Sequence, residues 1–360
     1  MGEKLYLGGD GRADSPGHSA KYMSYTMMEL RLNKIVDLQL VQRNNVGGSA
    51  YMEKAGLIQS VTSFKEDNFA IAELTTDRHP AVQKWVRENL TETKHNYDVW
   101  HVSKGNIWQI KSLAKQKGCE EVRPWIESLS NHMYWCAASS HEQPPEVIVA
   151  KWQSIGNHIQ DIHTGHGVLF PDCQHADLGQ DRGKKKWLKP STKACEKLVD
   201  LINKPRLLRD IKKLSTQHQT SNLEAFHSLI CQFAPKLTVY SFRGMLVRLL
   251  LAILHYNENS NRPQARNRDG DLIYVIKFPK AKRGHYTVKP KMVPPTFNYV
   301  SKLQEFLCDK VVLDPTPYQE KWQEVAVPEP MCSEYEWPDK DEAVAAHVSR
   351  FSKSKTFESV

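Results

Sequence analysis

The order of strand-forming and helix-forming segments in residues 1–106 is the feature that most constrains the fold of this chain. Strand patterns are recognised by alternating or β-branched apolar residues, and helices by apolar residues at a spacing of three and four. Proline at residue 80 stands at a favoured first-turn position of a helix. In chain order the segments are strands at 4–7, 20–30 and 34–42, a helix at 49–64, a strand at 70–75, a helix from Pro80, and a strand at 97–102.

This order predicts a three-stranded antiparallel meander followed by two parallel strands, because parallel strands need crossover connections that helices supply. We therefore expect an α/β fold of the RNase H-like kind, a five-stranded mixed sheet with flanking helices. Residues 107–215 are rich in tryptophan and mostly helical in pattern, which indicates a large helical insertion. The expected organisation is a first part of the core at 1–106, the insertion at 107–215, completing helices and a late strand (272–278) at 216–313, and a polar, flexible tail at 314–360.

The composition is typical of a globular protein, and its charge favours binding to an acidic partner. Of the 360 residues, 40% are hydrophobic and 25% charged, and the net charge of +8 favours an acidic partner such as nucleic acid. No segment approaches the roughly 20 apolar residues of a membrane span, so we expect no membrane association. The seven cysteines form no CxxC pair, which favours a reducing compartment over a disulfide framework.

Two aspartates stand where an RNase H-like sheet carries its metal ligands. Asp10 follows the first expected strand and Asp77 follows the fourth. Two divalent ions that promote phosphoryl transfer need carboxylates that converge on one point. Taken singly, each residue has a structural reading as well: Asp10 suits a turn after two glycines, and Asp77 suits the N-cap of a helix.

Five segments of the chain resemble transposases of the Kolobok group of cut-and-paste elements, over roughly residues 5–310. They are GGDGRADSPGHSAKYMSYTMMEL, TTDRHPAVQKWVRENL, YDVWHVSK, KGCEEVRPWIESLSNHMYWCAAS and TSNLEAFHSLICQFAPK, of which the DGR-x-DSPG-x-SAKY block is the most specific. The resemblance implies a DDE catalytic domain in which Asp10, Asp77 and Glu224 hold Mg²⁺ or Mn²⁺. Glu224 also lies away from the apolar side of its helical pattern, which leaves it free to face a metal.

The resemblance also implies the partners and the setting. We expect the chain to act on double-stranded DNA, both transposon ends and target, as a homo-oligomer on DNA in the nucleus. Kolobok-type transposases usually carry an N-terminal zinc-coordinating THAP domain, and no such pattern precedes the first strand here, so we expect this chain to correspond to the catalytic region. The competing hypotheses are a catalytically silent nucleic-acid-binding or scaffold protein that keeps the fold, and an RNase H-like nuclease of another kind.

Three further residues are expected to support the triad. Asp14 belongs to the same block as Asp10 and is its rival as metal ligand, although Asp14-Ser15-Pro16-Gly17 also suits a turn. His101 ends a D-x-x-H pattern on the expected last strand, a place where related transposases carry C-x-x-H or D-x-x-H. Asn222 stands two residues before Glu224.

A cluster of metal-ligand residue types lies within the insertion. Residues His158, His163, His166, Cys173 and His175 include C-x-H and H-x-x-H spacings, which permit a structural Zn²⁺ site. The expected ligands are His163, His166, Cys173 and His175. The alternative is a set of surface histidines beside a buried cysteine.

Basic side chains are expected to contact DNA phosphates in three stretches. A solvated surface is the alternative for each of them. The residues are Lys184, Lys185 and Lys186, then Arg206, Arg209, Lys212 and Lys213, and finally Lys280, Lys282 and Arg283.

Overall fold

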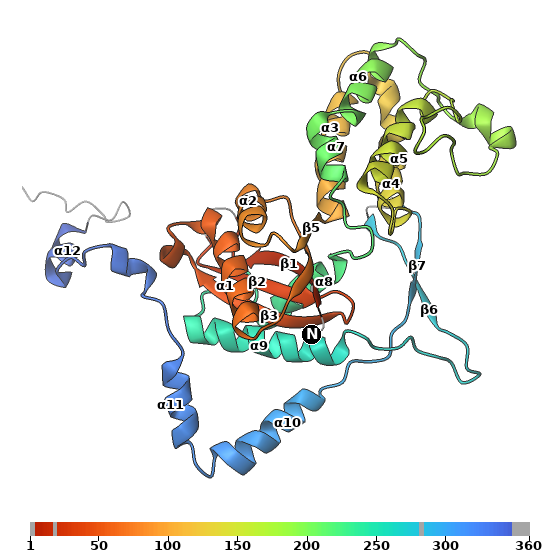
Figure 1. Cartoon of the computed structure of the whole chain (residues 1–360). Helices are drawn as coiled ribbons and strands as arrows, with labels where there is room; N and C mark the ends of the chain where they lie inside the picture. The colour runs from red at the N-terminus through yellow and green to blue at the C-terminus, as the bar shows by residue number, and fades with distance from the viewer. Residues whose placement is uncertain (1–3, 17–19, 281–283, 348–360) are drawn as a thin grey trace, which may run out of the picture.

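The computed structural model describes residues 4–16, 20–280 and 284–347. Its centre is a five-stranded sheet with the strand order β3-β2-β1-β4-β5 (Figure 1). The strands are β1 Leu5–Ala13, β2 Tyr22–Glu29, β3 Lys34–Gln42, β4 Ile71–Thr76 and β5 Lys94–Tyr97.

Strand directions confirm the expected RNase H-like α/β fold. β1 pairs antiparallel with β2, and β2 with β3, whereas β1 pairs parallel with β4, and β4 with β5. The expected strand at 34–42 has the bounds of β3, and Asn33 before it turns the chain with a positive φ of 55°. Asparagine tolerates this left-handed conformation better than most residues, which suits a tight hairpin.

Two of the expected strands end elsewhere. β1 continues through Asp10 to Ala13, so Asp10 lies within the strand instead of ending it. The strand expected at 97–102 is wrong: β5 ends at Tyr97, and α3 (Val99–Leu113) begins two residues later. The reason is Asp98, whose side chain accepts hydrogen bonds from the backbone N–H groups of Trp100 and His101 and so caps the helix.

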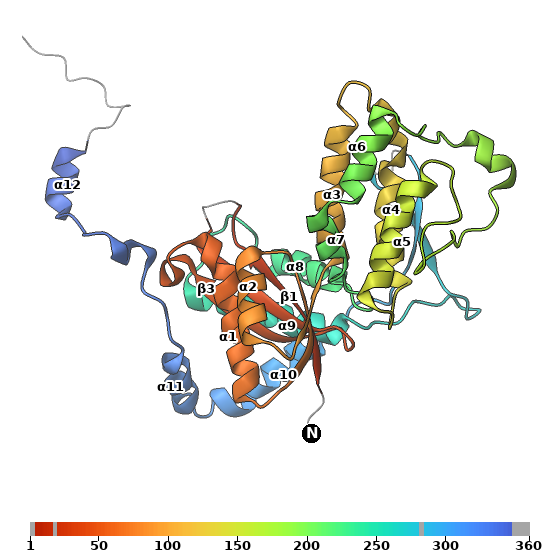
Figure 2. The same cartoon turned by 45° about the horizontal axis from the view of Figure 1, so that its top comes forward.

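Helices cover both faces of the sheet (Figure 2). The neighbouring residues Met27 and Met28 point to opposite faces, as the two-residue period of a strand requires. Met27 packs with α1 (Met52–Glu66) and α2 (Pro80–Asn89), and Met28 packs with α8 (Ser221–Phe233) and α9 (Phe242–Asn259). Both faces of β2 are therefore buried.

A helical unit with its own hydrophobic core lies beside the sheet (Figure 1). In the sequence it follows β5 and precedes α8. Trp152 is fully buried at its centre, and its indole N–H donates to the carbonyl of Ile202 at 3.0 Å. Its main helices are α3 Val99–Leu113, α4 Ile126–Ala138, α5 Pro145–His158, α6 Lys193–Ile202 and α7 Pro205–Ile211.

The C-terminal third contains a second, smaller sheet and further helices among its described residues. The late strand expected at 272–278 forms β6 (Tyr274–Lys277), which pairs with β7 (Thr287–Pro290) in a separate two-stranded sheet and does not join the large one. The expected flexible tail contains α11 (Thr316–Glu324) and α12 (Lys340–Ala346), which follow α10 (Asn298–Phe306); residues 348–360 of that tail lie outside the described part. Within the described ranges, no helix has the length and apolar character needed to cross a membrane.

Candidate active site

Asp10 and Asp77 lie beside each other at the centre of the sheet. Gly9 of β1 is paired with Thr76 of β4 in parallel register, so the residues that follow them, Asp10 and Asp77, are neighbours. Adjacent strands are about 4.8 Å apart, and residues in register on parallel strands point to the same side. Burial raises the pKa of Asp77, and the charge of Asp10 adds to this, which agrees with two carboxylates that lie near each other.

Glu224, on α8, is connected to Asp77 by the imidazole of His101. Nδ1 of His101 lies 2.9 Å from Oδ2 of Asp77, and Nε2 of the same ring lies 3.9 Å from Oε1 of Glu224. One imidazole thus spans the space between the second and third acids of the expected triad.

Asp98 holds both sides of this arrangement in place. Its Oδ2 accepts from the backbone N–H groups of Trp100 and His101, and its Oδ1 accepts from the backbone N–H of Thr220, immediately before α8. A single buried carboxylate therefore connects the first turn of α3, which carries His101, to the first turn of α8, which carries Glu224. This explains why Asp and His are separated by two residues here.

His227 is a neighbour of Asp10 that the sequence alone did not indicate. Its Nδ1 lies 3.4 Å from Oδ2 of Asp10, and its Nε2 lies 3.4 Å from the hydroxyl of Thr26. It follows Glu224 by three residues, so both side chains lie on the same face of α8. The E-x-x-H spacing was the available signal.

Glu53 is a fourth acid in the site, and it too was missed. It lies in the first turn of α1, and its side chain packs against Gly11 of β1. Burial, followed by the negative charges of Asp10 and Asp77, raises its pKa to about 7. No local pattern identifies this residue, because its position depends on the angle at which α1 crosses the sheet.

Burial and neighbouring negative charges raise the pKa of two of the acids, Asp77 and Glu224. Partial burial raises the pKa of Asp77, and the charge of Asp10 adds to this against the opposing hydrogen bond from His101. Burial and the charges of Asp98, Asp10 and Asp77 raise the pKa of Glu224 as well, with His101 opposing. Burial of His101 favours its neutral form, but the hydrogen bond and charge of Asp77 outweigh this and raise the pKa of the imidazole. Such a concentration of carboxylates is suited to divalent cations.

Two other residues of the DGR-x-DSPG block, Arg12 and Asp14, have structural roles. Both carboxylate oxygens of Asp14 accept backbone N–H groups, from Lys21 and Tyr22, each at 3.1 Å, which closes the β1–β2 turn. This use of its oxygens favours Asp10 over Asp14 as the metal ligand. Arg12 is buried and donates to the carbonyl of Ala234 at 3.0 Å, which fixes the end of α8 on β1. Asn222 is exposed on α8.

One of the three basic stretches lies next to the acids. The segment after α7 extends the sheet edge: Tyr97 donates from its backbone N–H to the carbonyl of Lys213, and Ser215 donates to the carbonyl of Tyr97. Arg78, which follows Asp77, forms an ion pair of 2.7 Å with Asp210 of α7. The exposed basic side chains on this segment are Arg206, Arg209, Lys212 and Lys213, of which Lys212 also pairs with Glu146 at 3.4 Å.

The other two basic stretches stand on separate elements (Figure 1). Lys185 and Lys186 are exposed near the 3-10 helix Gly179–Lys184, and Lys280 is exposed after β6. The side chain of Lys184 and the residues Lys282 and Arg283 lie outside the described part of the chain.

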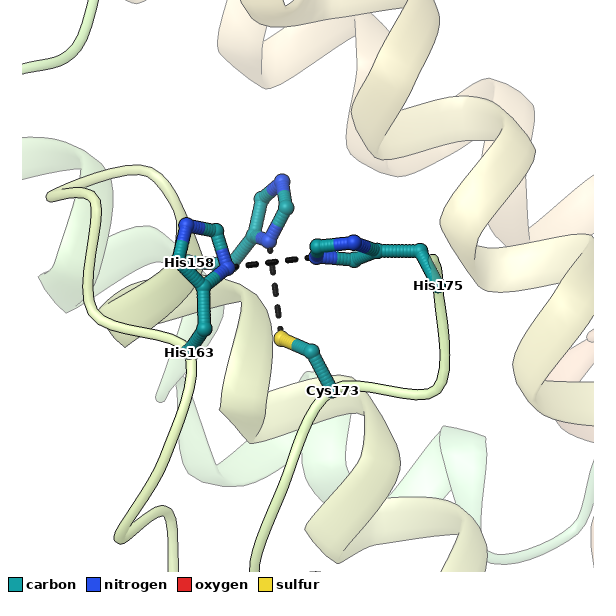
Figure 3. Close-up of side chains that lie close together, drawn as sticks. All are labelled: His158, His163, Cys173 and His175. Atoms are coloured by element: carbon teal, nitrogen blue, oxygen red, sulfur yellow. Dashed lines mark hydrogen bonds between the residues drawn. The ribbon is translucent and has the colours of Figure 1, made fainter. Parts of the chain in front are cut away.

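Three of the four expected metal ligands of the insertion lie close together, and His158 stands in place of the fourth (Figure 3). One ligand atom from each of four residues lies within 4.8 Å of the other three, and the residues are His158, His163, Cys173 and His175. His166, expected as a ligand, lies with its Nε2 3.2 Å from the sulfur of Cys173, and His158 takes its place.

Comparison with known proteins adds little to this description. No family model matches the sequence, and no curated protein matches it. Among solved structures, the chain is similar to the catalytic core domain of BIV integrase with 9% sequence identity and a TM-score of 0.18, over 36% of this chain and 70% of that one. The assignment of the fold rests on the strand order and directions.

Proposed function

We propose that this chain is the catalytic region of a DDE transposase of the Kolobok type, which cleaves and joins DNA strands at a centre formed by Asp10, Asp77 and Glu224. The observation that carries the proposal is the position of Asp10 within β1 and of Asp77 directly after β4, the parallel neighbour of β1, with Glu224 connected to Asp77 through His101.

The donor set fits Mg²⁺ or Mn²⁺. These ions prefer hard oxygen ligands, and the site offers carboxylates that are partly exposed and therefore accessible to metal and DNA. The raised pKa values of Asp77, Glu224 and Glu53 support this: burial is their main cause, and neighbouring carboxylates add negative charge that a bound cation would offset. When bound, two such ions would stabilise the attacking and leaving oxygens of an in-line displacement at phosphorus.

The surrounding residues position the acids and the substrate. His101 fixes the orientation of the Asp77 carboxylate, and His227 does the same for Asp10. The exposed basic side chains on and after α7 would bind the phosphate backbone of double-stranded DNA beside the acids. In this proposal the chain acts as a homo-oligomer on transposon ends and target DNA, in the nucleus.

The test is metal-dependent cleavage of supercoiled plasmid DNA by the purified chain. We expect nicking in Mg²⁺ or Mn²⁺ and its loss, by roughly a hundredfold or more, in Asp10→Asn, Asp77→Asn and Glu224→Gln. Folding measured by circular dichroism and DNA affinity should be preserved in these variants. Asp67→Asn is the matched control, since Asp67 is exposed at the far end of α1. Metal-independent nicking, or DNA binding by the wild type without any metal-dependent cleavage, would overturn the proposal; the second result would favour the silent binding protein.

A further inference from the structure

The four-residue cluster in the helical unit draws its members from separate parts of the chain. His158 is the last residue of α5, His163 lies in the loop that follows, and Cys173 and His175 lie further along before the 3-10 helix Gly179–Lys184. Nδ1 of His163 is 3.2 Å from Nε2 of His175, and Nδ1 of His158 is 3.5 Å from Sγ of Cys173. Figure 3 shows the three rings and the thiol directed at one point.

Two of the six separations match the edges of a tetrahedron around zinc, and all six lie within 4.8 Å. With Zn–N bonds near 2.05 Å and Zn–S bonds near 2.3 Å, ligand atoms are expected roughly 3.3 Å apart for two nitrogens and roughly 3.6 Å apart for nitrogen and sulfur. Three imidazoles and one thiolate complete the coordination of a structural zinc, which leaves no open position for a reacting water.

The hydrogen bonds that His163 and His175 make outside the cluster determine which ring nitrogen carries the proton, and they leave the lone pairs directed into the cluster. Nε2 of His163 donates to Oδ1 of Asp161 at 3.0 Å, and Nδ1 of His175 donates to the carbonyl of Ala176 at 2.8 Å. In the neutral rings, the facing nitrogens of His163 and His175 then both carry lone pairs, which repel each other unless a cation lies between them. Asp161 is itself held by Arg182 at 2.9 Å, an arrangement typical of carboxylate–histidine–zinc sites.

His166 supports the sulfur from outside the cluster. The side-chain amide of Asn157 donates to Nδ1 of His166 at 3.2 Å, so the proton of a neutral His166 ring is on Nε2. That N–H points at Sγ of Cys173 at 3.2 Å. A hydrogen bond of this kind stabilises a thiolate, which is the form of cysteine that binds metals.

We propose that His158, His163, Cys173 and His175 bind one Zn²⁺ in a closed tetrahedral site that fastens residues 159–192 to the end of α5. Binding converts the thiol of Cys173 to a thiolate and releases its proton to solvent. The segment between α5 and α6 needs such a fastening, because it is long and contains only one short 3-10 helix. The bound metal would connect the stretch with His158 and His163 to the stretch with Cys173 and His175. Trp187 lies beside this site, with its ring 5.6 Å from the rings of both His158 and His163.

The first test is the metal content of the untagged full-length chain. We expect one zinc per chain after purification, and one Co²⁺ per chain after exchange. Co²⁺ should give the strong visible absorption of tetrahedral coordination together with a near-ultraviolet sulfur-to-metal band. Absence of stoichiometric zinc after purification and after reconstitution would overturn the proposal, and so would a Co²⁺ spectrum without the sulfur band.

Variants then identify the ligands. Cys173→Ser should abolish the sulfur band, and His158→Ala should weaken zinc affinity more than His166→Ala does. For His166→Ala we expect affinity to fall by roughly 10- to 100-fold with the tetrahedral spectrum kept, as for other outer-shell partners. Cys308→Ser and His141→Ala, both exposed and outside the cluster, should leave binding unchanged. Complete loss of the site in His166→Ala with full retention in His158→Ala would contradict the assignment.

The outcome is separable from the proposed function. Asp77→Asn should keep its zinc and lose only Mg²⁺-dependent cleavage. If the ligand variants fail to fold, the stoichiometry and Co²⁺ spectrum of the wild type still decide whether the site exists.

Discussion

Nδ1 of His101 lies 2.9 Å from Oδ2 of Asp77, so a residue of α3, the first helix of the helical unit, touches a carboxylate at the end of the central sheet. The contact exists because Asp98 caps α3 and directs its first turn toward the acids. The helical unit therefore supplies part of the candidate active site instead of being only appended to it.

His101→Ala should lower metal-dependent cleavage by roughly 10- to 100-fold, because the carboxylate of Asp77 loses the partner that orients it. His101→Asn should restore part of the rate, since its amide can donate where Nδ1 did. The measurement is the cleavage rate as a function of Mg²⁺ concentration, in which a positioning role appears as a higher metal requirement. Lys111→Ala, further along α3 and exposed, is the control. An unchanged Mg²⁺ dependence in His101→Ala would speak against this role.

Glu53 makes the metal-free protein sensitive to pH. Its pKa rises from 4.5 to about 7 on folding, so its contribution to stability is fully present below pH 4.5 and is lost as pH rises through 7. Without divalent ions, Glu53→Gln should therefore become more stable relative to the wild type between pH 5 and pH 8, by up to about 3 kcal/mol.

The measurement for Glu53 is urea unfolding with EDTA present at both pH values. Added Mg²⁺ should reduce the difference, because cations offset the charge of the carboxylates. Glu66→Gln, exposed at the end of α1, should show no such trend. A Glu53→Gln effect of equal size at both pH values would contradict the buried position of this acid.

Gly56 allows α1 to pack closely on β2. A Cβ at this position would overlap the Cβ of Tyr25, so Gly56→Ala should lower the free energy of unfolding by about 1–3 kcal/mol through overpacking. Gly156 in α5 is the matched control. A Cβ there would meet Cγ2 of Val199 at an ordinary 3.9 Å, and Gly156→Ala should be neutral or stabilise the helix by up to about 1 kcal/mol. Equal effects of the two substitutions in chemical unfolding would show that the predicted contact with Tyr25 is absent.

The basic segment at α7 should bind DNA through phosphates. Arg209→Ala should weaken binding to all DNA sequences alike and reduce the slope of log affinity against log salt by about 1. Fluorescence anisotropy over a range of salt concentrations measures both quantities. Lys115→Ala, exposed beyond the far end of α3, should change neither. A sequence-dependent loss with an unchanged salt slope would rule out phosphate contact.

The fold was predictable from the sequence because strand periodicity and helix signals are local. The bounds of β3, the turn at Asn33 and the position of Asp77 after β4 all follow from neighbouring residues. The boundary at Asp98 was missed because YDVWHV alternates like a strand, and the capping role becomes visible only with α3 and Thr220 in place.

The parts of the site that the sequence did not indicate depend on packing between distant elements. Glu53 enters through the docking of α1, and His227 through the docking of α8 on β1. The exchange of His166 for His158 in the metal-ligand cluster has the same origin. The path of the loop, and not the H-x-x-H spacing of His163 and His166, decides which imidazole completes the group of four.

The most direct test of the proposed centre is the metal preference of Asp77→Cys. A thiolate is a poor ligand for Mg²⁺ and a better one for Mn²⁺, so exchanging a true ligand should change which metal supports the reaction. The measurement is the ratio of plasmid cleavage rates in Mn²⁺ and Mg²⁺ for the variant and the wild type. We expect cleavage by the variant in Mn²⁺ with none in Mg²⁺, whereas the wild type cleaves in both. Cleavage by the variant in Mg²⁺ at the wild-type rate would show that Asp77 does not bind the catalytic metal.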